Sequence, residues 1–92
     1  MHLLVSIDIP AQGLDAFNAY EDRVLSRLEA HGGQLGMRMR SPDGRREVHL
    51  LTFPDAVARE AFLADPERES HRHLWTESGA RADTLELERL DA

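Results

Sequence analysis

The sequence has 92 residues and a formal net charge of −6, and it contains neither cysteine nor lysine. This length suits one domain over residues 1–92, and an acidic chain is a poor partner for nucleic acid. The lack of cysteine excludes disulfides and thiolate metal sites, and the lack of lysine excludes Schiff-base catalysis. Apolar runs are short and no signal peptide begins the chain, so we expect a cytoplasmic protein without a membrane partner.

The first third of the chain predicts a strand followed by a helix. Residues 2–9 alternate between apolar and polar side chains, which is typical of a strand, and Pro10 ends it. Residues 14–30 change to helical spacing, with one apolar stripe that contains Leu14, Phe17, Val24, Leu25 and Leu28. Gly32-Gly33 then indicates the helix end, since glycine readily adopts the left-handed conformation there.

The middle of the chain predicts a hairpin. Residues 34–40 alternate, with Met37 and Met39 expected on the face opposite Arg38 and Arg40. Residues 41–44 read Ser-Pro-Asp-Gly, a strong turn signal, and residues 47–53 form the next predicted strand.

The last part of the chain predicts a broken helix and a final strand. The helix starts at Pro54-Asp55, restarts at Asp65-Pro66, and ends near Ser78-Gly79. An aspartate followed by proline is a helix-start signature, because aspartate caps free N–H groups and proline suits the first helical position. Residues 82–90 alternate again, with Leu85 and Leu87 expected to point inward.

The order of elements is therefore β-α-β-β-α-β, the ferredoxin-like α+β fold. Its usual result is a four-stranded antiparallel sheet with two helices on one face. Right-handed crossovers place the first and third strands side by side in the centre of that sheet.

The third strand predicts a homodimer. Val48, Leu50 and Thr52 share one face, and His49, Leu51 and Phe53 share the other. Both faces are largely apolar, which implies cover on both sides, and two helices can cover only one. A second copy of the chain would cover the other face, whereas a monomer with a mildly apolar open face is the alternative.

Several short motifs resemble one known superfamily. Tyr20-Glu21, Gly32-Gly33, Phe53-Pro54 and Asp65-Pro66 together are similar to the dimeric α/β-barrel superfamily, over nearly the whole chain. The closest resemblance is to small bacterial families of unknown function, and antibiotic-biosynthesis-type monooxygenases are similar in layout. The resemblance implies a homodimer whose sheets form a barrel, with a small cavity either between sheet and helices or inside the barrel. Cofactor-independent oxidation occurs in some members. None of these motifs is catalytic, so they predict the fold and not the reaction.

Polar residues on the sheet give the first candidate site. Ser6 and Asp8, Arg38 and Arg40, and Glu86 and Glu88 are expected on the sheet face away from the helices. Arg38 could hold an anionic group, since guanidinium is a planar two-pronged donor, and Ser6 could assist as a ligand-binding residue. The alternative is that the edge-strand charges are solvated or form dimer salt bridges.

Asp8 and His49 are the candidate catalytic residues. His49 lies in a central strand and could act as a general base, or it could be a core histidine satisfied by one hydrogen bond. We take strands one and three as parallel neighbours, so the two side chains come within reach if they share a face. If Phe53 packs under the helices, His49 lies on the helix side, away from Asp8; the opposite register brings them together. The first register is the one we favour.

The second helical region carries His71, His73 and Trp75. The two histidines are two residues apart and point in different directions on a helix, so we expect no metal site. Trp75 is interpreted as a helix anchor that is mostly buried, with contact to a ligand as the alternative.

These observations leave three functions open. The first is a cofactor-independent enzyme acting on a small, mostly apolar molecule, with no metal and no bound cofactor. The second is a non-catalytic binding or accessory module with the same cavity. The third is a purely structural dimeric interaction protein. A pocket with convergent polar groups would favour the first two.

Overall fold

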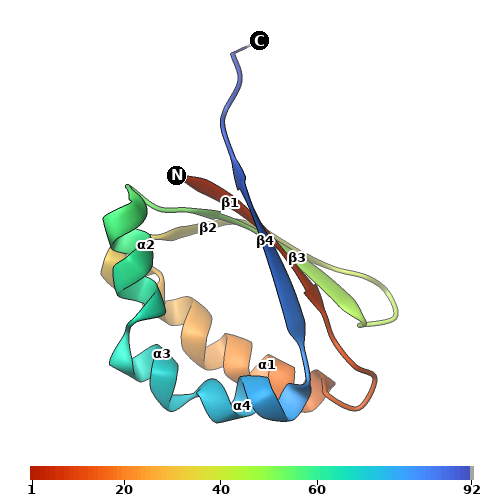
Figure 1. The fold of residues 1–92 in the computed structure, drawn as a ribbon. Helices are drawn as coiled ribbons and strands as arrows, with labels where there is room; N and C mark the ends of the chain where they lie inside the picture. The colour runs from red at the N-terminus through yellow and green to blue at the C-terminus, as the bar shows by residue number, and fades with distance from the viewer. Residues whose placement is uncertain (92) are drawn as a thin grey trace.

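A computed structural model describes residues 1–91 as one sheet with helices packed on one side of it (Figure 1). The expected order of elements is confirmed. The strands are β1 (His2–Asp8), β2 (Gln34–Arg40), β3 (Arg46–Thr52) and β4 (Arg81–Leu87). The helices are α1 (Leu14–Val24), α2 (Ala56–Leu63), α3 (Pro66–Ser70) and α4 (Arg72–Ser78). None of the helices within residues 1–91 has the length and apolar character needed to cross a bilayer.

The sheet has the strand order β2-β3-β1-β4, so β1 and β3 are the central pair as predicted. Every neighbouring pair is antiparallel. The assumption that strands one and three run parallel was therefore wrong: the chain reverses direction in the hairpin between β2 and β3. The antiparallel register places Val5 opposite His49 and Asp8 opposite Arg46.

The helices differ from the prediction in length and in number of pieces. The helix expected over residues 14–30 ends at Val24, and two short 3-10 turns, Leu25–Arg27 and Glu29–His31, carry the chain to Gly32. Gly32 has a φ of 74°, which agrees with its expected role at the helix end. The second helical region falls into α2, α3 and α4, and it begins and restarts at the two predicted caps. Asp55 accepts from the backbone N–H of Ala58, and Asp65 accepts from those of Glu67 and Arg68.

A bulge in β2 overturns the expected faces of that strand. The pairing with β3 shifts by one residue between Leu35 and Met37, at Gly36. A shift of one residue moves every later side chain to the opposite face. Arg38 and Arg40 therefore lie on the helix side, opposite His49 and Glu47, and not on the face away from the helices.

The final strand also differs from the prediction. β4 covers Arg81–Leu87 and not residues 82–90, and each of its residues is exposed in the single chain. Its pairing with β1 places Leu85 opposite Leu4 and Glu86 opposite Leu3. Leu85 and Leu87 thus face away from the helices and Glu86 lies on the helix side, the reverse of what we expected, while Glu88 follows the strand.

The sheet has one covered face and one apolar open face. The buried core lies between the covered face and the helices, and includes Leu3, Ile7, Phe17, Val24, Leu28, Leu51, Phe53 and Phe62. The open face carries the alternate residues of the four strands, among them Leu4, Met37, Met39, Val48, Leu50, Leu85 and Leu87. In Figure 1 all four helices lie on the same side of the sheet, so no helix or strand within residues 1–91 covers this open face.

Candidate functional site

A cluster of charged side chains is buried between the sheet and α1. Glu47 and His49 alternate on β3 and therefore share its helix-facing side, while Glu21 reaches the same place from α1. Their exposed fractions are 1%, 3% and 4%. His49 Nε2 lies 2.5 Å from Glu47 Oε2 and 3.5 Å from Glu21 Oε2.

Two arginines of β2 hold Glu47 in its ionised form. Arg40 Nε donates to Glu47 Oε1 at 2.7 Å, and Arg38 Nε donates to Glu47 Oε2 at 3.2 Å. A terminal nitrogen of Arg40 also donates to Asn18 Oδ1 of α1 at 2.7 Å, which holds the guanidinium group in place. Burial alone would raise the pKa of Glu47, but the hydrogen bonds from His49, Arg40 and Arg38 outweigh it and hold the pKa below its usual range.

Glu21 is in the opposite situation. Its Oε2 atom is buried and has no hydrogen-bond partner among the described residues, 1–91. Burial, and then repulsion by the Glu47 carboxylate, raise the pKa of Glu21 to about 7. The side chain therefore exchanges its proton close to neutral pH, which is the range in which a general acid or base is most useful.

The charge on Glu47 determines how the His49 ring is protonated. An ionised carboxylate only accepts hydrogen bonds, so His49 Nε2 must carry the hydrogen that it shares with Glu47. In the neutral ring, Nδ1 then keeps its lone pair and can accept a proton. Glu47 thus orients the ring and fixes the tautomer in which Nδ1 is the acceptor, as a carboxylate does beside a catalytic histidine.

His49 and Glu21 line a cavity between the sheet and the helices. The cavity has a volume of about 130 Å³. Most of its wall is apolar, with contributions from Leu3, Val24, Leu28, Leu51, Phe53 and Phe62, and its few polar residues include Tyr20 and Arg68. An apolar hollow with a small number of polar groups is the usual form of a small-molecule site.

The same cluster is the group within residues 1–91 that could hold a metal ion. Glu21, Glu47 and His49 offer one potential ligand atom each, and these atoms lie within 4.8 Å of one another. However, Arg38 and Arg40 both already pair with Glu47, and a divalent cation would add charge beside two guanidinium groups. The arrangement therefore suits a proton better than a divalent cation.

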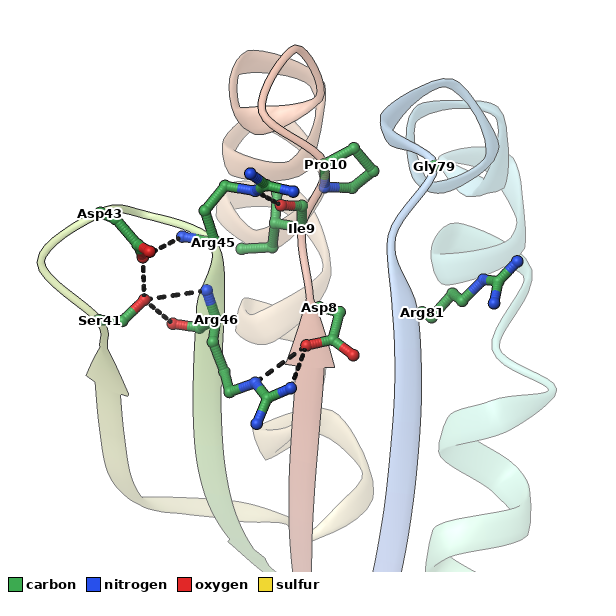
Figure 2. A pocket seen from close by; sticks show the side chains of 9 residues that line it. All are labelled: Asp8, Ile9, Pro10, Ser41, Asp43, Arg45, Arg46, Gly79 and Arg81. Atoms are coloured by element: carbon green, nitrogen blue, oxygen red, sulfur yellow. Dashed lines mark hydrogen bonds and ion pairs between the residues drawn. The ribbon is translucent and has the colours of Figure 1, made fainter.

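The structure does not bring the predicted pair Asp8 and His49 together. It adopts the register that we favoured, with His49 and Phe53 buried on the helix side and Asp8 on the open face. Figure 2 shows Asp8 at the end of β1, where Arg46 of β3 binds it through Nε at 2.9 Å and through a terminal nitrogen at 2.7 Å. Both side chains are more than half exposed, at 59% and 62%. Ser6 lies two residues before Asp8 on β1, on the same open face, and is half-buried.

Arg38 and Trp75 lie near the buried cluster. Arg38 contacts Glu47, so its role here is to hold a protein carboxylate. Trp75 of α4 is half-buried, lines the cavity, and packs against Phe17 and Tyr20 with ring centroids 6.2 and 5.3 Å away.

Sequence reasoning missed Glu21 and Glu47 as site residues, although both carried a signal. Glu47 lies two residues before His49 on a strand, so period two places them on one face. Glu21 lies four residues after Phe17 and three before Val24, which is the spacing of the buried helix stripe. A carboxylate within the apolar face of a strand or helix is unusual, and this was the signal that could have identified both residues.

Comparisons with known proteins establish the fold. In sequence, the chain matches no protein-family profile and no curated protein. In structure, it is similar to SnoaB, a cofactor-independent oxygenase from Streptomyces nogalater, with a TM-score of 0.73 and 14% identity over 97% of this chain and 93% of that one. A NIPSNAP domain protein from Burkholderia xenovorans gives a TM-score of 0.67 at 17% identity over 100% and 99% of the two chains. A NIPSNAP family protein of unknown function from Agrobacterium tumefaciens gives 0.68 at 19% identity over 99% and 91%.

These similarities extend over nearly the whole chain at low identity. They confirm the ferredoxin-like α+β fold and the layout inferred from the sequence, which is shared by antibiotic biosynthesis monooxygenase-like and NIPSNAP proteins. The chain is thus a small protein of a fold that hosts both a cofactor-independent oxygenase and proteins of unknown function. A shared fold does not determine activity, which depends on the residues of the site itself.

Proposed function

We propose that this protein is a cofactor-independent enzyme that moves a proton on a small, mostly apolar molecule bound between the sheet and the helices. The observation that carries the proposal is the buried His49, fixed by the ionised Glu47 and facing a second carboxyl group, Glu21, in the wall of an apolar cavity. In this scheme His49 Nδ1 takes a proton from a carbon atom next to a carbonyl group. The protonated Glu21 donates a hydrogen bond to the oxygen on which negative charge develops.

The geometry of the cluster favours catalysis over binding alone. A binding protein needs the apolar wall and one or two polar contacts, but it has no need for an ionised carboxylate that orients a histidine. SnoaB, which has the same fold, is a cofactor-independent oxygenase, and this supports chemistry without a bound cofactor in the present protein. Asp8 is not part of the proposed mechanism, because it lies on the opposite sheet face.

Exchange of carbon-bound hydrogen tests this proposal. Acetophenone is a single-ring ketone of suitable size, and NMR in D2O follows the loss of its methyl protons. We expect wild-type protein to accelerate the exchange, and His49→Gln to lower the rate by about a hundredfold or more, which is the usual contribution of a general base. His73→Gln, a change at an exposed histidine of α4, is the matched control. If acetophenone saturates the cavity without any faster exchange, the protein is a binding module.

We also propose that the protein works as a homodimer in the cytoplasm, with the open sheet faces of two copies packed together. The support is the apolar open face, which no helix or strand within residues 1–91 covers in Figure 1, since an uncovered apolar face often marks an interface between proteins. Sedimentation at micromolar concentration should give twice the chain mass of 10.4 kDa. Leu50→Asp should give the monomer, whereas Val57→Asp, at a site on α2 that is 77% exposed, should leave the dimer intact. A wild-type monomer would contradict this part of the proposal.

A further inference from the structure

Two buried side-chain polar atoms within residues 1–91 have no hydrogen-bond partner: Glu21 Oε2 and Arg68 Nε. Buried polar groups are normally paired, and an unpaired one costs free energy comparable to a lost hydrogen bond. Both residues line the same 130 Å³ cavity. Because both unpaired atoms belong to residues of one cavity, we infer that their hydrogen-bond partners are supplied by a molecule that binds there.

The Arg68 side chain is held in place by its neighbours. One terminal nitrogen donates to the carbonyl oxygen of Leu63 at 3.2 Å, and the guanidinium carbon lies 5.3 Å from the centre of the Phe62 ring. Its backbone N–H donates to Asp65, which caps α3. The guanidinium group is therefore positioned by the fold, and its Nε–H is the donor that no protein group uses.

Arg68 also lies where the cavity meets a second hollow. Tyr20, Arg68 and Trp75 line both the cavity and an adjoining space of about 120 Å³ between α1 and α3–α4. The other charged residues of that space, Glu69 and Arg72, form an ion pair at 3.2 Å. Arg68 is thus the cation there that lacks a carboxylate partner among residues 1–91.

We propose that the ligand of this cavity is a small organic acid that carries a second oxygen group. Its carboxylate accepts from Arg68 Nε, its apolar body fills the hollow, and its carbonyl or hydroxyl group lies at Glu21 and His49. This inference rests on the proposed function and names the substrate class for the same site.

The size and chemistry of the cavity set this class. A cavity of about 150 Å³ lined by aliphatic and aromatic side chains accommodates benzene, so about 130 Å³ suits one ring or a branched chain of similar bulk. Guanidinium forms stronger hydrogen bonds to a carboxylate than to a neutral amide, because both partners are charged. A neutral molecule of the same shape leaves Arg68 poorly satisfied and binds less tightly.

Trp75 provides the binding signal, since it is the single tryptophan of the chain and lines the cavity. Benzoate and benzamide have nearly the same shape and differ in charge, so they are the first pair of probes. At pH 6 we expect benzoate to quench Trp75 fluorescence with at least tenfold higher affinity than benzamide. We expect 3-hydroxybenzoate to bind more tightly than benzoate, and Glu21→Met to abolish that gain. Equal affinity for benzoate and benzamide would overturn the proposal.

Variants of Arg68 locate the contact. Arg68→Met should lower the affinity for benzoate at least tenfold and leave that for benzamide unchanged, with circular dichroism as the check on folding. Arg59→Met is the control, because Arg59 also lines the cavity but has no buried unpaired nitrogen. An equal loss of benzoate affinity in Arg68→Met and Arg59→Met would mean that benzoate is attracted by positive charge in general. That result would overturn the assignment of the contact to Arg68. If Arg68→Met does not fold, Arg68→Lys replaces it, since lysine keeps the charge without the Nε–H group.

This experiment and the exchange experiment fail in different ways. Binding of benzoate through Arg68 does not require the histidine to move a proton, so the ligand class can hold while the proposed catalysis fails. Conversely, exchange on acetophenone without preference for benzoate would support catalysis and contradict the ligand class.

Discussion

Asp65 and Glu21 are both carboxylates buried against a histidine, with exposed fractions of 2% and 4%, and their environments have opposite effects. Asp65 accepts from Arg27 at 2.8 Å, from the His31 ring at 2.6 Å, and from two backbone N–H groups of α3. Hydrogen bonds from Arg27 and His31 hold the pKa of Asp65 far below its usual range. Glu21 has no partner at Oε2, and burial raises its pKa to about 7.

Burial raises the pKa of Glu21, whereas at Asp65 hydrogen bonds from several partners outweigh it. A buried carboxylate with enough partners is therefore structural, and one with too few can be reactive. Asp65 links the turn after α1 to the start of α3, and its ionised form is fully satisfied. Glu21 can exchange a proton at neutral pH because its ionised form is poorly solvated. Three variants test this contrast.

The largest effect is expected at Asp65. Asp65→Asn removes the charge that binds Arg27 and His31, and the buried pair breaks. We expect the midpoint of thermal unfolding to fall by on the order of 10 °C at pH 7, measured by circular dichroism. Asp55→Asn is the control, because Asp55 caps α2 from an exposed position and asparagine caps equally well. Similar midpoints for the two variants would show that Asp65 acts only as a helix cap.

Glu21→Gln should have an effect of opposite sign that depends on pH. The folded chain holds the Glu21 proton up to about pH 7, whereas the unfolded chain releases it near pH 4.5. The wild-type protein therefore loses stability as the pH rises from about 4.5 to about 7, where the loss is complete, and the full rise in pKa corresponds to about 3 kcal/mol. Glutamine carries no charge at any pH, so the variant lacks this loss.

Urea unfolding at pH 5 and pH 8.5 measures the effect. We expect the two proteins to differ little at pH 5, and the variant to be more stable by up to about 3 kcal/mol at pH 8.5. The same difference at both pH values would mean that Glu21 does not titrate near neutrality.

The two carboxylates also show which features of the structure could be predicted from the sequence. The capping role of Asp65 could be predicted, because aspartate before Pro66 is a local signal and the backbone N–H groups that it caps lie within three residues. Its pairing with Arg27 and His31, more than thirty residues away, could not. The central position of β1 and β3 followed from the order of the strands. The alternation of β3 left both faces possible for His49, and only the expected packing of Phe53 favoured the helix side.

The surroundings of Glu21 could not be predicted in the same way. The Gly36 bulge turns Arg38 and Arg40 toward Glu47, and a bulge changes faces without changing the apparent alternation. Whether a buried carboxylate has a partner depends on atoms from α1, β2 and β3 at once. The orphaned Arg68 Nε likewise depends on how the guanidinium group lies on Phe62 and Leu63, a side-chain conformation that the residue pattern does not specify.

The smallest effect is expected at the Asp8–Arg46 pair, which extends the contrast to an exposed carboxylate. Figure 2 shows the two side chains paired at the end of β1, and both are more than half exposed, so water screens their attraction and competes for their hydrogen bonds. Asp8→Asn should change the free energy of unfolding by less than about 1 kcal/mol in urea titrations. It should also leave the exchange rate of acetophenone unchanged, because the sheet separates Asp8 from His49. Loss of exchange activity in Asp8→Asn would place the chemistry on the open face and contradict the assignment to the buried cavity.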